Sequence, residues 1–255
     1  MNYEYFFILF IYLVFISLLF FGKSFFLLIC FLKFFDIMGP PIFLQKTMKK
    51  KFKKFVKDKT EFNKIKPKKN AIYLLMPHGP TFFPALRLPF LYNFEDEYPL
   101  LFINKWFLLI PGFAAITKLF SGFISTEKGN LKLAILQKAR PIIIYPNGAK
   151  EVLANSIQNP KILLPIQKKI LYYLLKSKKN IHVVTILNET KCYSFNSSLV
   201  KIYKFINKFI DIGIPFPLPY YSGEKLNIHM SNAINTKKFK NIYILEKKIL
   251  NHLKI

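Results

Sequence analysis

The sequence predicts an α/β domain with a largely parallel sheet, preceded by a hydrophobic N-terminal segment. Three observations support this prediction. Short apolar or β-branched runs alternate with helix-like stretches, Pro/Gly turns close several of these runs, and most of the apolar excess lies in the first 40 residues. Alternating strands and helices are typical of layered βα domains. At 255 residues, the chain can form one membrane segment and one domain with a sizeable core.

The expected strands are 71–75, 100–103, 123–125, 142–145, 181–187 and 226–230, and the expected helices are 126–139, 165–178 and 238–253. Prolines at positions 84 and 89 predict that any helix in the stretch 81–92 is kinked. Two short helices are expected within 104–120. A proline-rich apolar loop is expected at 211–221.

The first 41 residues are predicted to form a membrane anchor or hairpin. Residues 5–21 are apolar except for Ser17 and two tyrosines, and as a helix they would be roughly 25 Å long, slightly under the hydrocarbon core of a bilayer. A second apolar run covers 25–35. A signal peptide is the alternative, but the only early charge is Glu4 and no small-residue cleavage site follows.

Residues 45–70 contain twelve lysines against Asp58 and Glu61. Phe52, Phe55 and Val56 lie among these lysines, which favours an amphipathic helix on a membrane surface. The predicted organisation is therefore an anchor or hairpin at 1–41, a lysine-rich amphipathic linker at 42–70 and a catalytic domain at 71–255. Lysines beside a hydrophobic segment also predict that this flank faces the cytoplasm.

The net charge of +26 suggests an anionic partner such as phospholipid headgroups, coenzyme A phosphates or nucleic acid. A general bias toward Lys, Ile, Asn and Phe weakens this signal. The phenylalanines among the lysines and the preceding anchor argue against a nucleic-acid partner. Cys30 and Cys192 lie far apart without a Cys-x-x-Cys motif, so neither a metal site nor a disulfide framework is expected.

Two stretches repeat one design, in which a buried strand runs into a Pro/Gly turn. The first, residues 70–80, delivers His78 into such a turn, and the second, residues 141–151, ends at Glu151. In α/β folds ligands bind beyond the carboxyl ends of the strands, and histidine can exchange a proton near neutral pH. Taken alone, the first stretch favours a turn histidine that has no catalytic role.

These motifs resemble those of the type 2 diacylglycerol acyltransferase family, within the glycerolipid acyltransferase superfamily. Met76-Pro77-His78-Gly79 is similar to a His-Pro-His-Gly motif, and residues 146–151 are similar to a Pro-Gly-Gly-Ala-x-Glu motif. The resemblance spans roughly residues 71–232. It implies a glycerolipid-acyltransferase-like layered domain and a membrane-bound enzyme that transfers an acyl chain to diacylglycerol, monoacylglycerol or a long-chain alcohol. Acyl-CoA would be a co-substrate, no cofactor would be needed, and the membrane would be of endoplasmic-reticulum type.

The resemblance and the chemistry together suggest roles for seven residues. His78 would act as general base, and Glu151 would orient its ring, with Glu189 as the second choice. The alternative role for Glu151 is a helix N-terminal charge. The expected substrate-binding or oxyanion residues are Gly79, Asn147, Gly148, Lys150 and Glu189.

The sequence departs from the family at three places and from the wider superfamily at a fourth. Met76 replaces the first motif histidine, and Asn188 replaces a turn glycine before Glu189. Residues 167–170, Gln-Lys-Lys-Ile, stand where the family has Arg-x-Gly-Phe. The wider superfamily has an aspartate five positions after its histidine, where this chain has Phe83, and the type 2 diacylglycerol family also lacks that aspartate.

Three other functions compete with this one. A lysophospholipid acyltransferase is disfavoured by Phe83, and an α/β-hydrolase-like esterase is disfavoured because the chain has no Gly-x-Ser-x-Gly motif. A catalytically degenerate membrane or lipid-droplet binding protein is the third. The sequence leaves the acceptor and the oligomeric state open.

Overall fold

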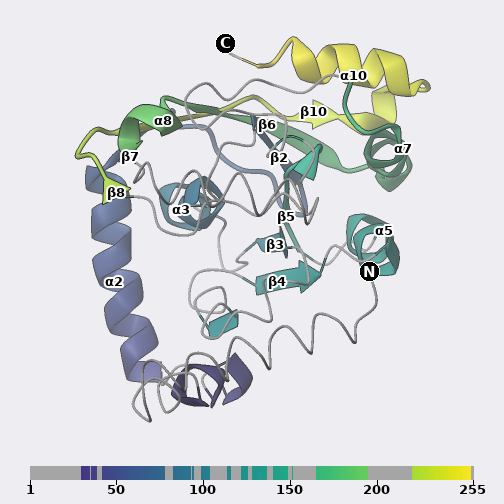
Figure 1. Ribbon diagram of the computed structural model, residues 1–255. Helices are drawn as coiled ribbons and strands as arrows, with labels where there is room; N and C mark the ends of the chain where they lie inside the picture. The colour runs from purple at the N-terminus through teal and green to yellow at the C-terminus, as the bar shows by residue number, and fades with distance from the viewer. Residues whose placement is uncertain are drawn as a thin grey trace, which may run out of the picture.

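The computed structural model of the protein places one sheet between two layers of helices (Figure 1). The structure describes residues 30–34, 36–38, 42–77, 83–92, 94, 99–103, 114–115, 122–125, 128–136, 140–148, 151, 165–194 and 220–253. One layer contains α2 (Ile42–Asp58) and α3 (Phe83–Leu91). The other contains α5 (Lys128–Leu136), α7 (Lys168–Ser177) and α10 (Ile242–Leu250).

The main sheet has eight strands in the order β1-β9-β6-β2-β5-β3-β4, with β10 paired to β6 beside this path. The strands are β1 (Thr60–Phe62), β2 (Ile72–Met76), β3 (Leu100–Ile103), β4 (Gly122–Ser125), β5 (Ile142–Ile144), β6 (Asn180–Leu187), β9 (Leu226–Met230) and β10 (Ile234–Asn235). The run from β6 through β2, β5 and β3 to β4 is parallel, whereas β9 and β10 are antiparallel to β6. The predicted α/β class with a largely parallel sheet is confirmed.

Strand β2 lies at the centre of the sheet, and all five of its side chains are fully buried. Successive side chains of a strand point to opposite faces. Tyr73 and Leu75 therefore pack with α2 and α3, whereas Ile72, Leu74 and Met76 pack with α5, α7 and α10. Burial of a large apolar side chain contributes about 1.5 to 3 kcal/mol relative to exposure, so this strand anchors both layers.

Most expected elements are present. The predicted strands at 71–75, 100–103, 123–125, 142–145, 181–187 and 226–230 match β2, β3, β4, β5, β6 and β9 to within one residue at each end, and the helices predicted at 126–139, 165–178 and 238–253 contain α5, α7 and α10. In the stretch 81–92, α3 forms with Pro89 inside it. The stretches 104–120 and 211–221 lie mostly outside the described residues. Strands β1 and β10 were not predicted.

The lysine-rich segment 42–70 is packed against the domain through its apolar side chains. Val56 of α2 is fully buried, and the ring of Phe52 meets Phe90 of α3 edge-on with 5.2 Å between ring centroids. Strand β1 of the same segment pairs in parallel with β9. Part of the apolar side of α2 thus packs on the domain core, whereas Met48 and Phe55 stay 38% and 36% exposed and most lysines of α2 are exposed. The contact of this segment with a membrane stays a prediction.

The predicted membrane hairpin lies almost entirely outside the described residues. Of the helices in the described ranges, none combines the length and the apolar character needed to cross a bilayer. The described part of 30–38 is helical. Asp36 fixes it to the domain, because Oδ1 accepts a hydrogen bond from the backbone N–H of Ala115 at 2.8 Å. Its other carboxylate oxygen lies 3.3 Å from the Lys33 ammonium.

His182 of β6 is buried, and both of its ring nitrogens are engaged. The backbone N–H of Lys68 donates to Nε2 at 3.3 Å, and Nδ1 lies 2.9 Å from the carbonyl oxygen of Ser231. Because a carbonyl only accepts, Nδ1 carries the proton and the ring is neutral. The ring stacks on Tyr73 with 5.1 Å between centroids. Burial is the main cause that lowers the pKa of His182 below its usual 6.5.

This lowered pKa predicts a loss of stability in acid. The unfolded chain binds a proton at His182 at higher pH than the folded chain does, so this contribution to stability is complete above about pH 6.5 and decreases below it. We expect the free energy of unfolding to fall less between about pH 7 and pH 5.5 in His182→Gln than in the wild type. Urea unfolding at both pH values measures this difference, and equal falls in the two proteins would contradict it.

Candidate functional site

Three parallel strands, β5, β2 and β6, end at the same edge of the sheet. Leu74 of β2 pairs with Ile144 of β5, and Met76 pairs with Thr185 of β6. The turns that follow Met76, Ile144 and Leu187 therefore leave the sheet at one edge. Each of these turns leads into a segment that the sequence predicted to carry site residues. The carboxyl edge of a parallel sheet is the usual position for a ligand site.

His78, Gly79 and Lys150 lie outside the described residues. After β2 the described chain reaches Pro77, one residue before His78. Met76, at the first position of the His-Pro-His-Gly pattern, is fully buried in the apolar cluster that faces α5, α7 and α10. In this chain the position is therefore a packing position, which suits a methionine.

Asn147 and Gly148 shape the turn after β5. Gly148 has φ 49°, a left-handed conformation that glycine adopts without steric cost, and its N–H donates to the carbonyl of Tyr145 at 3.1 Å. Asn147 is buried and is tied to Gln167 twice. Its Oδ1 accepts from the Gln167 backbone N–H, and its carbonyl accepts from the Gln167 side-chain amide, both at 3.1 Å. The Gly148 N–H is thus engaged in closing the turn.

The turn after β6 uses Asn188 where the resembling family has glycine. Asn188 has φ 51°, and asparagine tolerates the left-handed region better than most residues. Its side chain adds two hydrogen bonds: Nδ2 donates to the carbonyl of Lys225 at 2.7 Å, and Oδ1 accepts from the N–H of Asn227 at 2.9 Å. This turn places Glu189 at the start of α8 (Glu189–Cys192).

Glu151 and Glu189, the two carboxylates predicted to orient the histidine, are both buried, with exposed fractions of 0% and 2%. Both act on the phenol of Tyr145, which follows β5. Burial is the main cause that raises the pKa of Tyr145 well above its usual value, and the charges of Glu189 and Glu151 raise it further. Glu151 and Glu189 follow β5 and β6, the two strands that flank β2, and both lie on the side of the sheet where these strands end.

A buried arginine on α3 completes this region. The Arg87 guanidinium donates to the carbonyl of Lys59 at 2.9 Å, to the hydroxyl of Thr60 at 2.7 Å and to the phenol oxygen of Tyr193 at 2.8 Å. Burial raises the pKa of Tyr193, Arg87 opposes the rise, and Glu189 adds to it. We refer to Arg87, Tyr145, Glu151, Glu189 and Tyr193 as the buried polar cluster.

Sequence reasoning missed Arg87, Tyr145 and Tyr193 as members of this cluster. One signal was present for Arg87: only positions 87 and 140 are arginine among 39 basic residues, and position 87 lies in an apolar helix. A chain that uses lysine almost everywhere keeps arginine where a planar group with several donors is needed. Among the described residues, no three His, Cys, Asp or Glu side chains gather as metal ligands would.

Comparison with known proteins identifies a shared fold. No protein-family model matches the sequence, and no curated protein matches it. Among solved structures, the 1-acyl-sn-glycerophosphate (LPA) acyltransferase PlsC from Thermotoga maritima is similar, with a TM-score of 0.52 over 87% of this chain and 84% of that chain. The chain shares the fold of this acyltransferase. Sequence identity between the two is 15%, so the similarity concerns the fold alone.

Two substitutions at Asn188 separate the contributions of its backbone and its side chain. Both Asn188→Ala and Asn188→Gly lose the two side-chain hydrogen bonds, but alanine keeps a β-carbon in the left-handed region whereas glycine removes it. We expect the alanine variant to be less stable than the glycine variant by about 1 kcal/mol in urea unfolding. A glycine variant that is no more stable than the alanine variant would show that the turn carries no such strain.

Proposed function

We propose that the protein is a membrane-bound O-acyltransferase that moves a fatty acyl chain from acyl-CoA to the hydroxyl of a glycerolipid or long-chain alcohol. The observation that carries this proposal is the arrangement at the carboxyl edge of the sheet. Strand β2 leads toward His78 between two strands whose following segments bear the buried Glu151 and Glu189. The fold is shared with an enzyme whose name states acyl transfer to 1-acyl-sn-glycerophosphate.

The proposed chemistry uses His78 as general base. Its imidazole takes the proton of the acceptor hydroxyl, and the acceptor oxygen attacks the thioester carbonyl carbon. When the tetrahedral intermediate collapses, the carbon–sulfur bond breaks, and coenzyme A leaves as a thiolate that takes the proton from the imidazolium. The N–H of Gly79 is a proposed donor to the oxyanion, and Lys150 a proposed partner for phosphate.

A buried carboxylate beside His78 would hold the imidazole in one orientation and stabilise the imidazolium. We propose Glu151 for this role and Glu189 as its alternative. Burial strengthens the field of either carboxylate, because the low dielectric of the interior screens charge less than water does.

For the acceptor we propose diacylglycerol, monoacylglycerol or a long-chain alcohol. Phe83 supports this choice, because it stands where the wider superfamily has an aspartate. Lysophosphatidate is the second candidate acceptor, favoured by the similarity in fold to PlsC.

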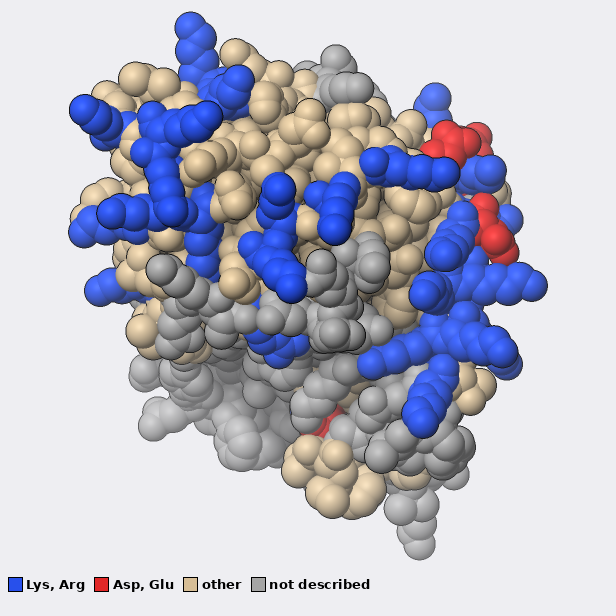
Figure 2. All heavy atoms as spheres, turned by 180° about the vertical axis from the view of Figure 1, so that it is seen from behind, with Lys and Arg blue, Asp and Glu red and all other residues tan. Residues whose placement is uncertain are grey.

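The outward lysines of α2 support contact with an anionic membrane. Figure 2 shows the molecule from behind, with basic side chains along the edge where α2 lies and few acidic ones beside them. Lysines near a membrane surface each contribute about 1 kcal/mol of attraction to anionic lipid. We propose that the domain lies on the cytoplasmic face of an endoplasmic-reticulum-type membrane.

Membranes that contain the protein are expected to transfer label from long-chain acyl-CoA to an acceptor, and His78→Ala is expected to lower the rate by about 100-fold or more, because the general base is lost. Diacylglycerol, monoacylglycerol, a fatty alcohol and lysophosphatidate are offered separately, and the labelled product is measured. His252→Ala is the matched control, because His252 follows α10 and none of the proposed catalytic or binding roles falls on it.

Label in phosphatidate alone would replace the neutral-lipid acceptors with the second candidate. If no acceptor is labelled while the protein is folded and membrane-bound, the proposed activity is wrong and the chain is a binding protein on an acyltransferase fold.

The orienting carboxylate is identified by its effect on the pH dependence of transfer. A carboxylate beside His78 raises the pKa of the imidazolium, and the base is active only when deprotonated. In the variant that lacks the orienting carboxylate, the acid limb of the rate profile should therefore move to lower pH, with a fall in maximal rate. We expect this shift in Glu151→Gln and a smaller one in Glu189→Gln. The reverse order would assign the role to Glu189, and a loss of rate without any shift in either variant would indicate only a structural role.

A further inference from the structure

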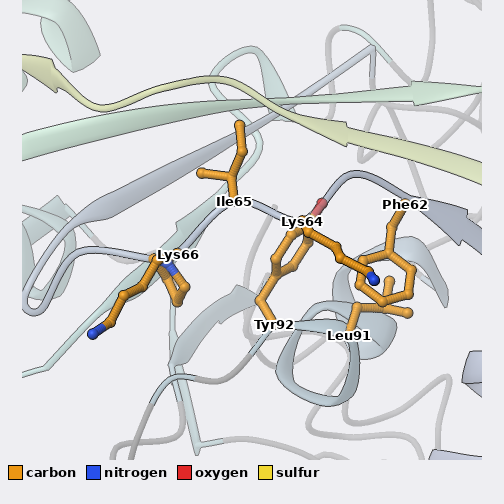
Figure 3. Close-up of a pocket in the computed structure, with 7 residues that line it drawn as sticks. Phe62, Lys64, Ile65, Lys66, Leu91 and Tyr92 are labelled. Carbon is orange, nitrogen blue, oxygen red and sulfur yellow. The ribbon is translucent and has the colours of Figure 1, made fainter.

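A cavity of about 380 Å³ lies beside β1 and the segment that follows it. Its walls come from the segment that leads from β1 into the start of β2 and from the C-terminal end of α3 (Figure 3). The lining residues are Phe62, Lys64, Ile65, Lys66, Pro67, Leu91 and Tyr92. Strands β9 and β6 lie between β1 and β2, so β1 is three strand spacings, roughly 14 Å, away from the strand that leads to His78.

The lining selects for an apolar chain. Apart from its two lysines, the cavity presents aromatic and aliphatic side chains. The hydroxyl of Tyr92 is already engaged, since it donates to Oδ1 of Asn63 at 3.0 Å. No amide, carboxylate or aliphatic hydroxyl stands among the seven lining residues to bind a sugar or the edge of a nucleobase. A volume of this size is at the lower end for ligand pockets, which suits one chain better than two.

The walls are held in place in the absence of a ligand. The side chain of Asn63 clamps the backbone of Met230, because Nδ2 donates to its carbonyl at 2.7 Å and Oδ1 accepts from its N–H at 2.8 Å. The same Oδ1 holds Tyr92, whose ring meets Phe62 edge-on with 5.6 Å between centroids. Pre-organised walls reduce the ordering cost of binding.

The charged side chains at the rim of the cavity are all positive. Lys64 and Lys66 are exposed, and Figure 3 shows that their side chains extend in different directions, Lys64 toward Phe62 and Lys66 away from it. No acidic residue lines the cavity. A cationic rim beside an apolar wall complements a ligand with one anionic end and one apolar chain.

We propose that this cavity binds a long-chain fatty acid, with the chain against Phe62, Ile65 and Leu91 and the carboxylate at the lysine rim. The site is separate from the proposed acyl-transfer site, and its occupation does not depend on that activity.

The test is photolabelling of the full-length protein in neutral-lipid vesicles with a sixteen-carbon fatty acid that bears a diazirine in its chain. Labelled peptides are mapped by mass spectrometry. We expect label within residues 60–67 or at 91–92, and we expect unlabelled palmitate to compete with it. The double variant Lys64→Glu/Lys66→Glu should lower labelling about fivefold, because two attractions to the carboxylate become repulsions. Ile65→Trp, which fills the cavity, should lower it independently of charge.

Two controls are matched to these variants. Lys237→Glu/Lys238→Glu reverses two charges of η2 (Thr236–Lys238) and should leave labelling unchanged. His78→Ala should also leave it unchanged, which separates this site from the proposed catalytic one. The proposal is overturned if the label maps elsewhere, if palmitate does not compete, or if labelling survives both cavity variants. Equal labelling of the cavity by a diazirine analogue of hexadecanol and by the fatty acid analogue would also overturn the proposal. So would labelling by a phosphate-bearing analogue alone.

Discussion

Parallel pairing of β2 with β5 on one side and β6 on the other is the constraint on which the rest of the structure depends. The paired strands lie far apart along the chain, yet the register fixes where each must end. Because β2 is buried on both faces, a shift in register would move each side chain to the opposite layer, and its one polar group, the hydroxyl of Tyr73, is satisfied by the carbonyl of Lys68. The turns after the three strands therefore meet at one edge.

Much of the fold follows from local patterns. The run 142–144 is continuously apolar and 181–187 is nearly so, and such runs are typical of parallel strands that are buried on both faces. Strand β1 could not be predicted, because Thr-Glu-Phe carries no periodic signal and its partner β9 lies near the other end of the chain. The apolar residues of α2 were recognised and predicted to lie on a membrane surface. Burial of Val56 shows that part of this side packs on the core, which sequence could not show because residues that share this core cluster, such as Leu226 and Ile228, lie far along the chain.

The candidate site, like the fold, was predicted from the sequence only in part. Glu151 and Glu189 were found through short motifs that follow strands, and the structure buries both. Gln167 looked like a departure from the resembling family, yet it serves this chain as the partner of Asn147. Tyr145 and Arg87 were not found through a sequence motif, because the residues with which they interact lie far away in the chain. Both carboxylates follow strands that flank β2, so the order of the strands in the sheet, which short motifs do not reveal, decides on which side of the domain they lie.

The position of β9 has a consequence for how the chain is made. β9 lies between β1 and β6, and the clamp from Asn63 to Met230 joins positions 167 residues apart. During translation β1 has no strand to pair with until the last part of the chain leaves the ribosome. Through that interval its free edge is open to other nascent chains. The lysines around β1 repel a second copy of the same segment. Their positive charge therefore opposes association between nascent chains before β9 has been synthesised.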